Sequence, residues 1–197
     1  SHSASHVTFA CVSPEGEMGY PGRLEARATY RLDDALTIEM EARTDAPTVV
    51  NLVNHAYFNL AGQGTGDVLG QQLQVEAKHF LPVGAGLIPT GEVLSVAATP
   101  FDFRSARTIG EALPGPGGFD HNLCLSAPLG PDGLRPCLVV TDPVSGRSLR
   151  LSTTEPGVQL YTGAHFSGGP GKAGARYPRF AGFATETQRF PDSPNRP

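Results

Sequence analysis

The chain has 197 residues, of which 39% are hydrophobic and 17% are charged, and this is enough to form one globular core. Its formal net charge is -4 and it has no basic block, which argues against a nucleic-acid or anionic-membrane partner. No apolar run approaches the roughly 20 residues of a membrane span, and the N-terminal residues do not resemble a signal peptide. We therefore expect a cytoplasmic protein with a small, neutral partner.

Alternation of apolar and polar residues first appears at Arg23 and predicts a hairpin. From 23 to 32 the even positions are apolar and the odd positions are polar, which is typical of a half-buried strand. The same pattern returns from 36 to 42. Because Asp33 and Asp34 favour a turn, residues 23–43 are predicted to form an antiparallel β-hairpin.

Further short strands are predicted along the rest of the chain, with room for one short helix over 105–113. The strands are expected at 48–53, 72–77, 122–126, 135–141, 147–153 and 157–162. The 24 glycines and 18 prolines are spread as turn residues, and 110–120 reads as a loop. With no internal repeat or linker, we expect an all-β sandwich or barrel and a single domain over residues 1–197.

The cysteine pattern indicates neither a disulfide framework nor a zinc site. Cys11, Cys124 and Cys137 are odd in number and lack CxxC or metal-ligand spacing with histidine. A reducing compartment fits this usage best.

A few polar residues stand out because a β-sandwich core does not need them. His55 and the Asp120-His121 pair each fit a structural role, and Glu186 fits a solvated strand edge, so the residues alone leave structural and functional roles open. A histidine, an aspartate and a glutamate without a serine nucleophile elbow, phosphate loop or metal cluster suit general acid–base chemistry on a neutral polar ligand.

Seven segments in order resemble a known family. The stretch NLVNHAYFNLAG (51–62) resembles the N-x-x-N-H-S-Y-F-N-L stretch of the aldose 1-epimerases, also called galactose mutarotases. The other matching segments are SPEGEMGYPGRLEARATYRL (13–32), FLPVGAGLIPTGE (80–92), TPFDFR (99–104), GGFDHN (117–122), TTEPGVQLYTG (153–163) and TETQRFPDSPN (185–195). The resemblance covers nearly the whole chain.

The resemblance implies a fold, a reaction and four site residues. The fold would be an antiparallel β-supersandwich of the galactose mutarotase type, and the reaction would interconvert the α and β anomers of aldohexoses such as glucose and galactose. His55 would be the general acid toward the sugar ring oxygen and Glu186 the general base. Asp120 would bind sugar hydroxyls, and Gln159 would be a lesser contact. No metal or cofactor is implied, because the reaction needs only proton transfers.

The resemblance also implies a partial chain. Family members carry an upstream half-sandwich with an Asn-Arg pair and a second histidine, and they continue beyond the equivalent of Pro197. We therefore expect this chain to lack the N-terminal part and to stop early at the C-terminus, with weak or absent activity by itself and unpaired strand edges that favour self-association. Ala56 and Phe119 replace the family's serine and tyrosine, which are milder changes.

Two functional readings remain open, an aldose 1-epimerase and a non-catalytic carbohydrate-binding or remnant module. Epimerisation of hexose 6-phosphates is disfavoured, because no arginine cluster accompanies the matched motifs. For the enzyme, we expect His55 and Glu186 on opposite sides of one concave face, several ångströms apart and both open to solvent, with Asp120 pointing into the same cleft.

Overall fold

The computed structural model describes residues 2–196, and these form two compact units divided between Asn54 and His55. All paired strands of both units are antiparallel, so the all-β prediction is confirmed. Within the described residues, helical structure is limited to α1 (Ile109–Ala112), which is shorter than the predicted 105–113, and to four 3₁₀ turns at Glu17–Gly19, Ala85–Leu87, Lys172–Gly174 and Ser193–Asn195. The prediction of a single domain stays a prediction.

The N-terminal unit contains one three-stranded sheet in the order β1 (His6–Ser13), β2 (Leu24–Leu32) and β3 (Leu36–Thr44). The predicted hairpin is confirmed, since β2 and β3 pair along their whole length and close at Leu32 opposite Leu36. The strand β1 was not predicted, because the apolar residues of its HVTFACVS sequence form a run and do not alternate strictly.

Two strand predictions were wrong, for different reasons. Residues 48–53 form no strand and follow Pro47 in the extended connection toward the second unit, because apolar β-formers make a strand only where a neighbour accepts their backbone hydrogen bonds. Residues 72–77 divide into two strands of different sheets. Glu76 is the crossing point, where its N–H donates to Cys137 O and its carbonyl accepts from Ser126 N.

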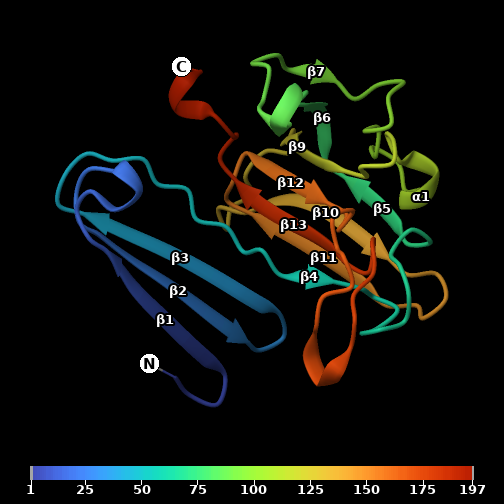
Figure 1. Ribbon diagram of the computed structural model, residues 1–197, viewed down its shortest axis with the longest axis horizontal. Helices are drawn as coiled ribbons and strands as arrows, with labels where there is room; N and C mark the ends of the chain where they lie inside the picture. Colours follow the sequence, from blue (N-terminus) through green and yellow to red (C-terminus); the bar gives the residue numbers. More distant parts are fainter. Residues whose placement is uncertain (1, 197) are drawn as a thin grey trace. The chain divides into compact units, whose positions relative to one another are not determined.

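The C-terminal unit contains two sheets (Figure 1). The four-stranded sheet has the order β11 (Ser148–Thr153), β10 (Arg135–Thr141), β5 (Gln72–Val75) and β8 (Arg107–Thr108). The six-stranded sheet has the order β4 (Tyr57–Phe58), β13 (Phe183–Gln188), β12 (Gly157–Tyr161), β9 (Asp120–Leu125), β6 (Ala77–Phe80) and β7 (Leu94–Ser95). Four of the strands, β9 to β12, lie within two residues of their predicted ranges, so those predictions are confirmed.

A single hydrophobic core joins the two sheets of the C-terminal unit. Side chains on one face of β9, β12 and β13 pack with side chains of β5 and β10, among them Leu123, Val158, Leu160, Phe183, Leu73, Val75, Leu138 and Val140. Because successive side chains of a strand point to opposite faces, the intervening residues of β9, β12 and β13 face away from this core. That second face is where the polar candidates lie.

Two cysteines contribute to the buried structure as thiols. Cys124 and Cys137 are both free and buried, and burial raises the pKa of their thiols to about 11 and about 12. The exposed Cys11 is also free. Over residues 2–196, no cluster of three or more histidine, cysteine or acidic side chains is arranged to hold a metal ion. The same residues contain no helix of the length and apolar character needed to cross a membrane.

We expect Phe183→Ala to destabilise the C-terminal unit strongly. Phe183 is completely buried and contacts Phe58, and removing a buried phenyl ring generally costs about 3–5 kcal/mol. Val144→Ala is the control, because Val144 is almost fully exposed and its truncation should change stability by less than about 0.5 kcal/mol. Urea unfolding followed by circular dichroism measures both. Equal stabilities for the two variants would contradict the core described here.

Candidate active site

The register of three strands places the acidic and amide candidates on one face of the six-stranded sheet. On the central strand β12, Gln159 lies directly opposite Glu186 of β13 and Asn122 of β9. Tyr161, two residues farther along β12, lies opposite Asp120 of β9. Directly opposed residues of an antiparallel pair point to the same side of the sheet. These side chains therefore share the face that points away from the core.

His55 joins this face through the short strand β4. Tyr57 of β4 pairs with Ala184 of β13, and continuing this antiparallel register by two residues brings His55 opposite Glu186. His55 Nε2 lies 3.4 Å from Glu186 Oε1. The imidazole also lies against the Tyr57 ring, with centroids 5.1 Å apart, and Tyr57 in turn contacts Phe166 edge-on.

Asp120 and Gln159 form a second contact beside the first. The Gln159 Nε2 amide donates a hydrogen bond to Asp120 Oδ1 over 2.7 Å. All four residues expected from the sequence thus come together, and they line one cavity of ≈ 300 Å³. The cavity is completed by Tyr161, Gln188 and Pro191.

The separation and exposure expected for the acid–base pair were wrong. His55 and Glu186 are in direct contact, and their side chains are 49% and 12% exposed, so the histidine is half-exposed whereas the glutamate is mostly buried. The physical reason is their position in the sheet, because directly opposed side chains have Cβ atoms only about 5 Å apart. The pair therefore lies side by side on one wall of the cavity. Asp120, in contrast, points into the cavity as expected.

The electrostatics of the cavity disfavour negative charge. Partial burial raises the pKa of Glu186, the positive charge of His55 opposes this shift, and the nearby Asp120 carboxylate adds to it. Burial also raises the pKa of Tyr57, with smaller contributions from Tyr161, Glu186 and Asp120. Glu186 thus binds a proton more readily than an exposed glutamate does, which suits a group that must accept a proton and later return it.

His121 belongs to the core side of the sheet and not to the cavity. Its ring packs against Phe101 with centroids 4.6 Å apart, and its Nδ1 accepts a hydrogen bond from the Asp120 backbone N–H. Burial lowers the pKa of His121, and the charge of Asp120 opposes this only in part. This histidine is therefore a neutral packing residue, as the structural reading of the Asp120-His121 pair allowed.

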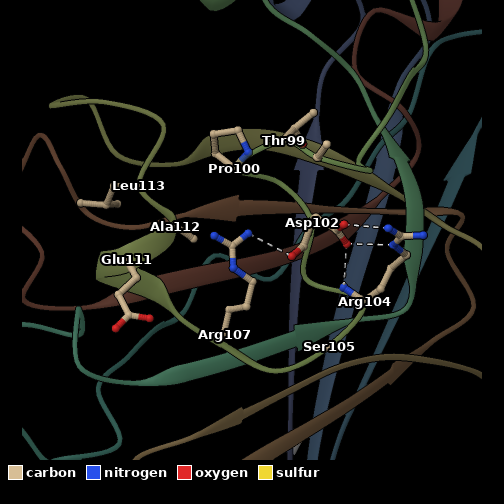
Figure 2. Close-up of a pocket in the computed structure, with 10 residues that line it drawn as sticks. Thr99, Pro100, Asp102, Arg104, Ser105, Arg107, Glu111, Ala112 and Leu113 are labelled. Carbon is tan, nitrogen blue, oxygen red and sulfur yellow. Dashed lines mark hydrogen bonds and ion pairs between the residues drawn. The ribbon is translucent and has the colours of Figure 1, made fainter.

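A larger cavity of ≈ 750 Å³ lies elsewhere in the same unit, near α1 (Figure 2). Arg104 makes a two-pronged ion pair with Asp102 and holds the pKa of that carboxyl down at about 2. Arg107 donates to the Asp102 carbonyl and stacks on Phe103. The charges that line this larger cavity largely compensate one another, and none of the four residues expected from the sequence lines the cavity. The smaller cavity is therefore the candidate site.

Comparison with known proteins connects this arrangement to a family. The family model for aldose 1-epimerase matches residues 1–197. The chain belongs to the aldose 1-epimerase family. It is 47% identical to the galactose mutarotase of Bos taurus over 195 residues and 38% identical to the aldose 1-epimerase of Escherichia coli over 199 residues.

Solved structures of the family share the fold. An aldose epimerase homologue from C. elegans superposes with a TM-score of 0.86 at 30% identity, over 98% of this chain and 59% of that one. The galactose 1-epimerase of Lactobacillus acidophilus gives 0.79 at 30% identity, over 97% of this chain and 57% of that one. The mutarotase-like fold expected from the sequence is confirmed.

The chain spans little more than half of the length of its curated relatives. The alignment covers 97% of this chain in both cases, but 56% of the Bos taurus protein and 57% of the Escherichia coli protein. The shared region includes all residues of the candidate site described above.

Three residues of the cavity were not predicted from the sequence, although all three lie within family-like motifs. Tyr161 follows Gln159 by two positions in TTEPGVQLYTG, and Gln188 follows Glu186 by two in TETQRFPDSPN. Period-two alternation along a strand puts such residues on the same face, so this pattern was a usable signal. Pro191 lies beyond the end of β13, where no strand periodicity applies.

The pKa of Glu186 should respond in opposite directions to changes in its two charged neighbours. Asp120→Asn removes a negative charge, so we expect the pKa of Glu186 to fall. His55→Gln removes a positive charge, so we expect it to rise. Carboxyl ¹³C NMR titration measures the shift, with Glu111→Gln in the other cavity as the control that leaves it unchanged. Shifts of the same sign in both variants would refute this electrostatic description.

Proposed function

We propose that the protein interconverts the α and β anomers of an aldohexose, with Glu186 as general base and His55 as general acid. The observation that carries the proposal is the contact between His55 Nε2 and Glu186 Oε1 in a cavity that also receives Asp120 and Gln159. Membership of the aldose 1-epimerase family supports the same assignment. The acid–base pair and the polar pair supply the two requirements of the reaction, proton transfer and orientation of the sugar.

The chemistry uses two proton transfers in each direction. Glu186 takes the proton of the C1 hydroxyl while the protonated His55 gives its proton to the ring oxygen, so that the bond from C1 to the ring oxygen breaks and a C1 carbonyl forms. Rotation about the bond between C1 and C2 presents the other face of the carbonyl. Closure reverses both transfers, because His55 recovers its proton from the released hydroxyl and Glu186 returns its proton to the new C1 oxygen. No electrons are gained or lost, and the balanced reaction calls for no cofactor.

Side-by-side placement of acid and base suits this reaction. The C1 hydroxyl and the ring oxygen are bonded to the same carbon, so one edge of the sugar can meet both groups from the same side. The distance of 3.4 Å between His55 Nε2 and Glu186 Oε1 supports this arrangement, because both groups can then reach one edge of the sugar. Approach of the sugar then replaces the contact between His55 and Glu186 by one contact from each residue to the substrate.

Asp120 and Gln159 would orient the sugar. A carboxylate accepts hydrogen bonds from hydroxyl groups, and the hydrogen bond from Gln159 occupies Asp120 Oδ1 and fixes the plane of the carboxylate. The partner is therefore a neutral monosaccharide. Cytoplasmic location and self-association through strand edges stay predictions.

Polarimetry of freshly dissolved α-D-glucose or α-D-galactose tests the activity. We expect only a weak acceleration of mutarotation above the spontaneous rate, because the chain spans little more than half of the length of its relatives. Glu186→Gln or His55→Gln should lower kcat by about 10²- to 10⁴-fold, because each removes one proton-transfer group. Glu111→Gln is the control that keeps the rate. Saturable sugar binding without acceleration would refute the enzyme and favour the carbohydrate-binding module.

Asp120→Asn should show whether Asp120 orients the sugar or takes part in the chemical step. The substitution keeps the shape of the side chain but replaces one acceptor oxygen by a donor, so binding of sugar hydroxyls weakens in the ground state and the transition state alike. We expect KM to rise more than kcat falls, which is the kinetic signature of lost uniform binding. A collapse of kcat at unchanged KM would instead give Asp120 a role in the chemical step.

A further inference from the structure

Asn122 is a buried residue of the site face that the proposed chemistry leaves without a role. It closes the GGFDHN motif and is only 2% exposed. Neither its Nδ2 nor its Oδ1 has a hydrogen-bond partner among residues 2–196. Buried amides without partners are rare and destabilise a fold, because their lost hydration is not replaced. An apolar residue of similar shape would serve packing better, so the amide calls for a functional explanation.

Gln159, on the neighbouring strand β12, carries a complementary group. Asn122 is directly opposite Gln159 in the β9–β12 ladder, at a Cβ separation of about 5 Å typical of such pairs. Gln159 uses its Nε2 on Asp120, while its Oε1 is buried and has no partner in the described part of the chain. A buried donor and a buried acceptor, both unpaired, therefore belong to adjacent side chains on the same face.

The absence of a side chain at Gly157 leaves room for the Asn122 amide. A Cβ added at Gly157 would lie 2.7 Å from Asn122 Oδ1 and 3.0 Å from its Nδ2, so any larger residue there would press on the amide. The amide lies against Gly157, which is two residues from Gln159 along β12. A side-chain rotation toward Gln159 would satisfy both unpaired groups.

We propose that Asn122 is a positioning residue that donates from Nδ2 to Gln159 Oε1 and thereby orients Gln159 toward Asp120. The two ends of the Gln159 amide differ, since Nε2–H attracts the Asp120 carboxylate and Oε1 repels it. Holding Oε1 at Asn122 keeps the donor end on Asp120 Oδ1 and leaves the other carboxylate oxygen for the sugar. The role of Asn122 in sugar binding rests on the proposed function, whereas the hydrogen bond from Asn122 to Gln159 does not.

Asn122→Leu tests the role by separating stability from binding. Asn122→Leu removes the proposed hydrogen bond but also removes a buried Oδ1 that has no partner, so we expect the melting temperature to change little. KM should rise about three- to tenfold with little change in kcat, the effect of one lost net hydrogen bond. Asn122→Asp cannot donate to Gln159 Oε1 and should raise KM at least as much. A merely structural Asn122 gives the reverse, a lower melting temperature at unchanged KM, and overturns the proposal.

Gln71→Leu is the matched control. Gln71 is also a buried amide with an unpaired Oε1, but its Nε2 donates to Asn59 Oδ1 and it lines neither cavity described above. We expect this change to lower the melting temperature and to leave KM as it is. A rise in KM equal to that of Asn122→Leu would overturn the proposal, because loss of any buried amide would then suffice.

Coupling between the residues tests the route through Gln159. In a Gln159→Leu background, Asn122→Leu should raise KM no further, whereas an undiminished effect overturns the route. The side-chain NH₂ signal of Gln159 in a ¹⁵N spectrum gives a readout without catalysis, and Asn122→Leu should shift it and speed its exchange with water. If the chain does not accelerate mutarotation, the proposed function fails, while an unmoved Gln159 signal would overturn the Asn122 proposal itself.

Discussion

Backbone pairing among β9, β12 and β13 is the constraint on which both the fold and the site depend. Gln159 can meet Glu186 and Asn122 only because β12 is paired on both sides in this register. A slip of one residue would turn Gln159 into the core and bring its apolar neighbours Val158 or Leu160 to the cavity. Burial of those neighbours in the core holds the register, so the energy that stabilises the C-terminal unit also assembles the site.

Much of the fold could be predicted because its signals are local. The hairpin at 23–43 and the strands around the 142–146 turn follow from period-two alternation and turn residues close in sequence. The predictions that were wrong depended on distant partners. Val49 and Val50 have strong β propensity, but their segment pairs with no strand. The crossing from one sheet to the other at Glu76 is defined by backbone hydrogen bonds to Cys137 and Ser126, which lie far from Glu76 in the sequence.

The residues of the candidate site could be predicted from the sequence, but the distances between them could not. The family-like motifs pointed to His55, Asp120, Gln159 and Glu186, and all four line one cavity. Their distances depend on which strands pair, and His55 and Glu186 are separated by most of the unit in sequence. Without the register of β4 on β13, a separation of several ångströms across one concave face was a reasonable expectation for an acid and a base. The pairing instead makes them neighbours on one wall.

The proposed acid and base are held to different degrees, and the difference fits the tasks proposed for them. Glu186 lies inside β13, paired to β12, and its side chain is only 12% exposed, so its position is set by the ladder. His55 precedes β4, outside the paired residues, and is held by the Tyr57 ring and by Glu186 itself. In the proposed reaction, a C1 hydroxyl would take the place of His55 beside Glu186, and the imidazole would turn to the ring oxygen while the carboxylate stays fixed. In the proposed mechanism, the His55–Glu186 contact is the resting form of the pair, and the substrate replaces it by coming between the two side chains.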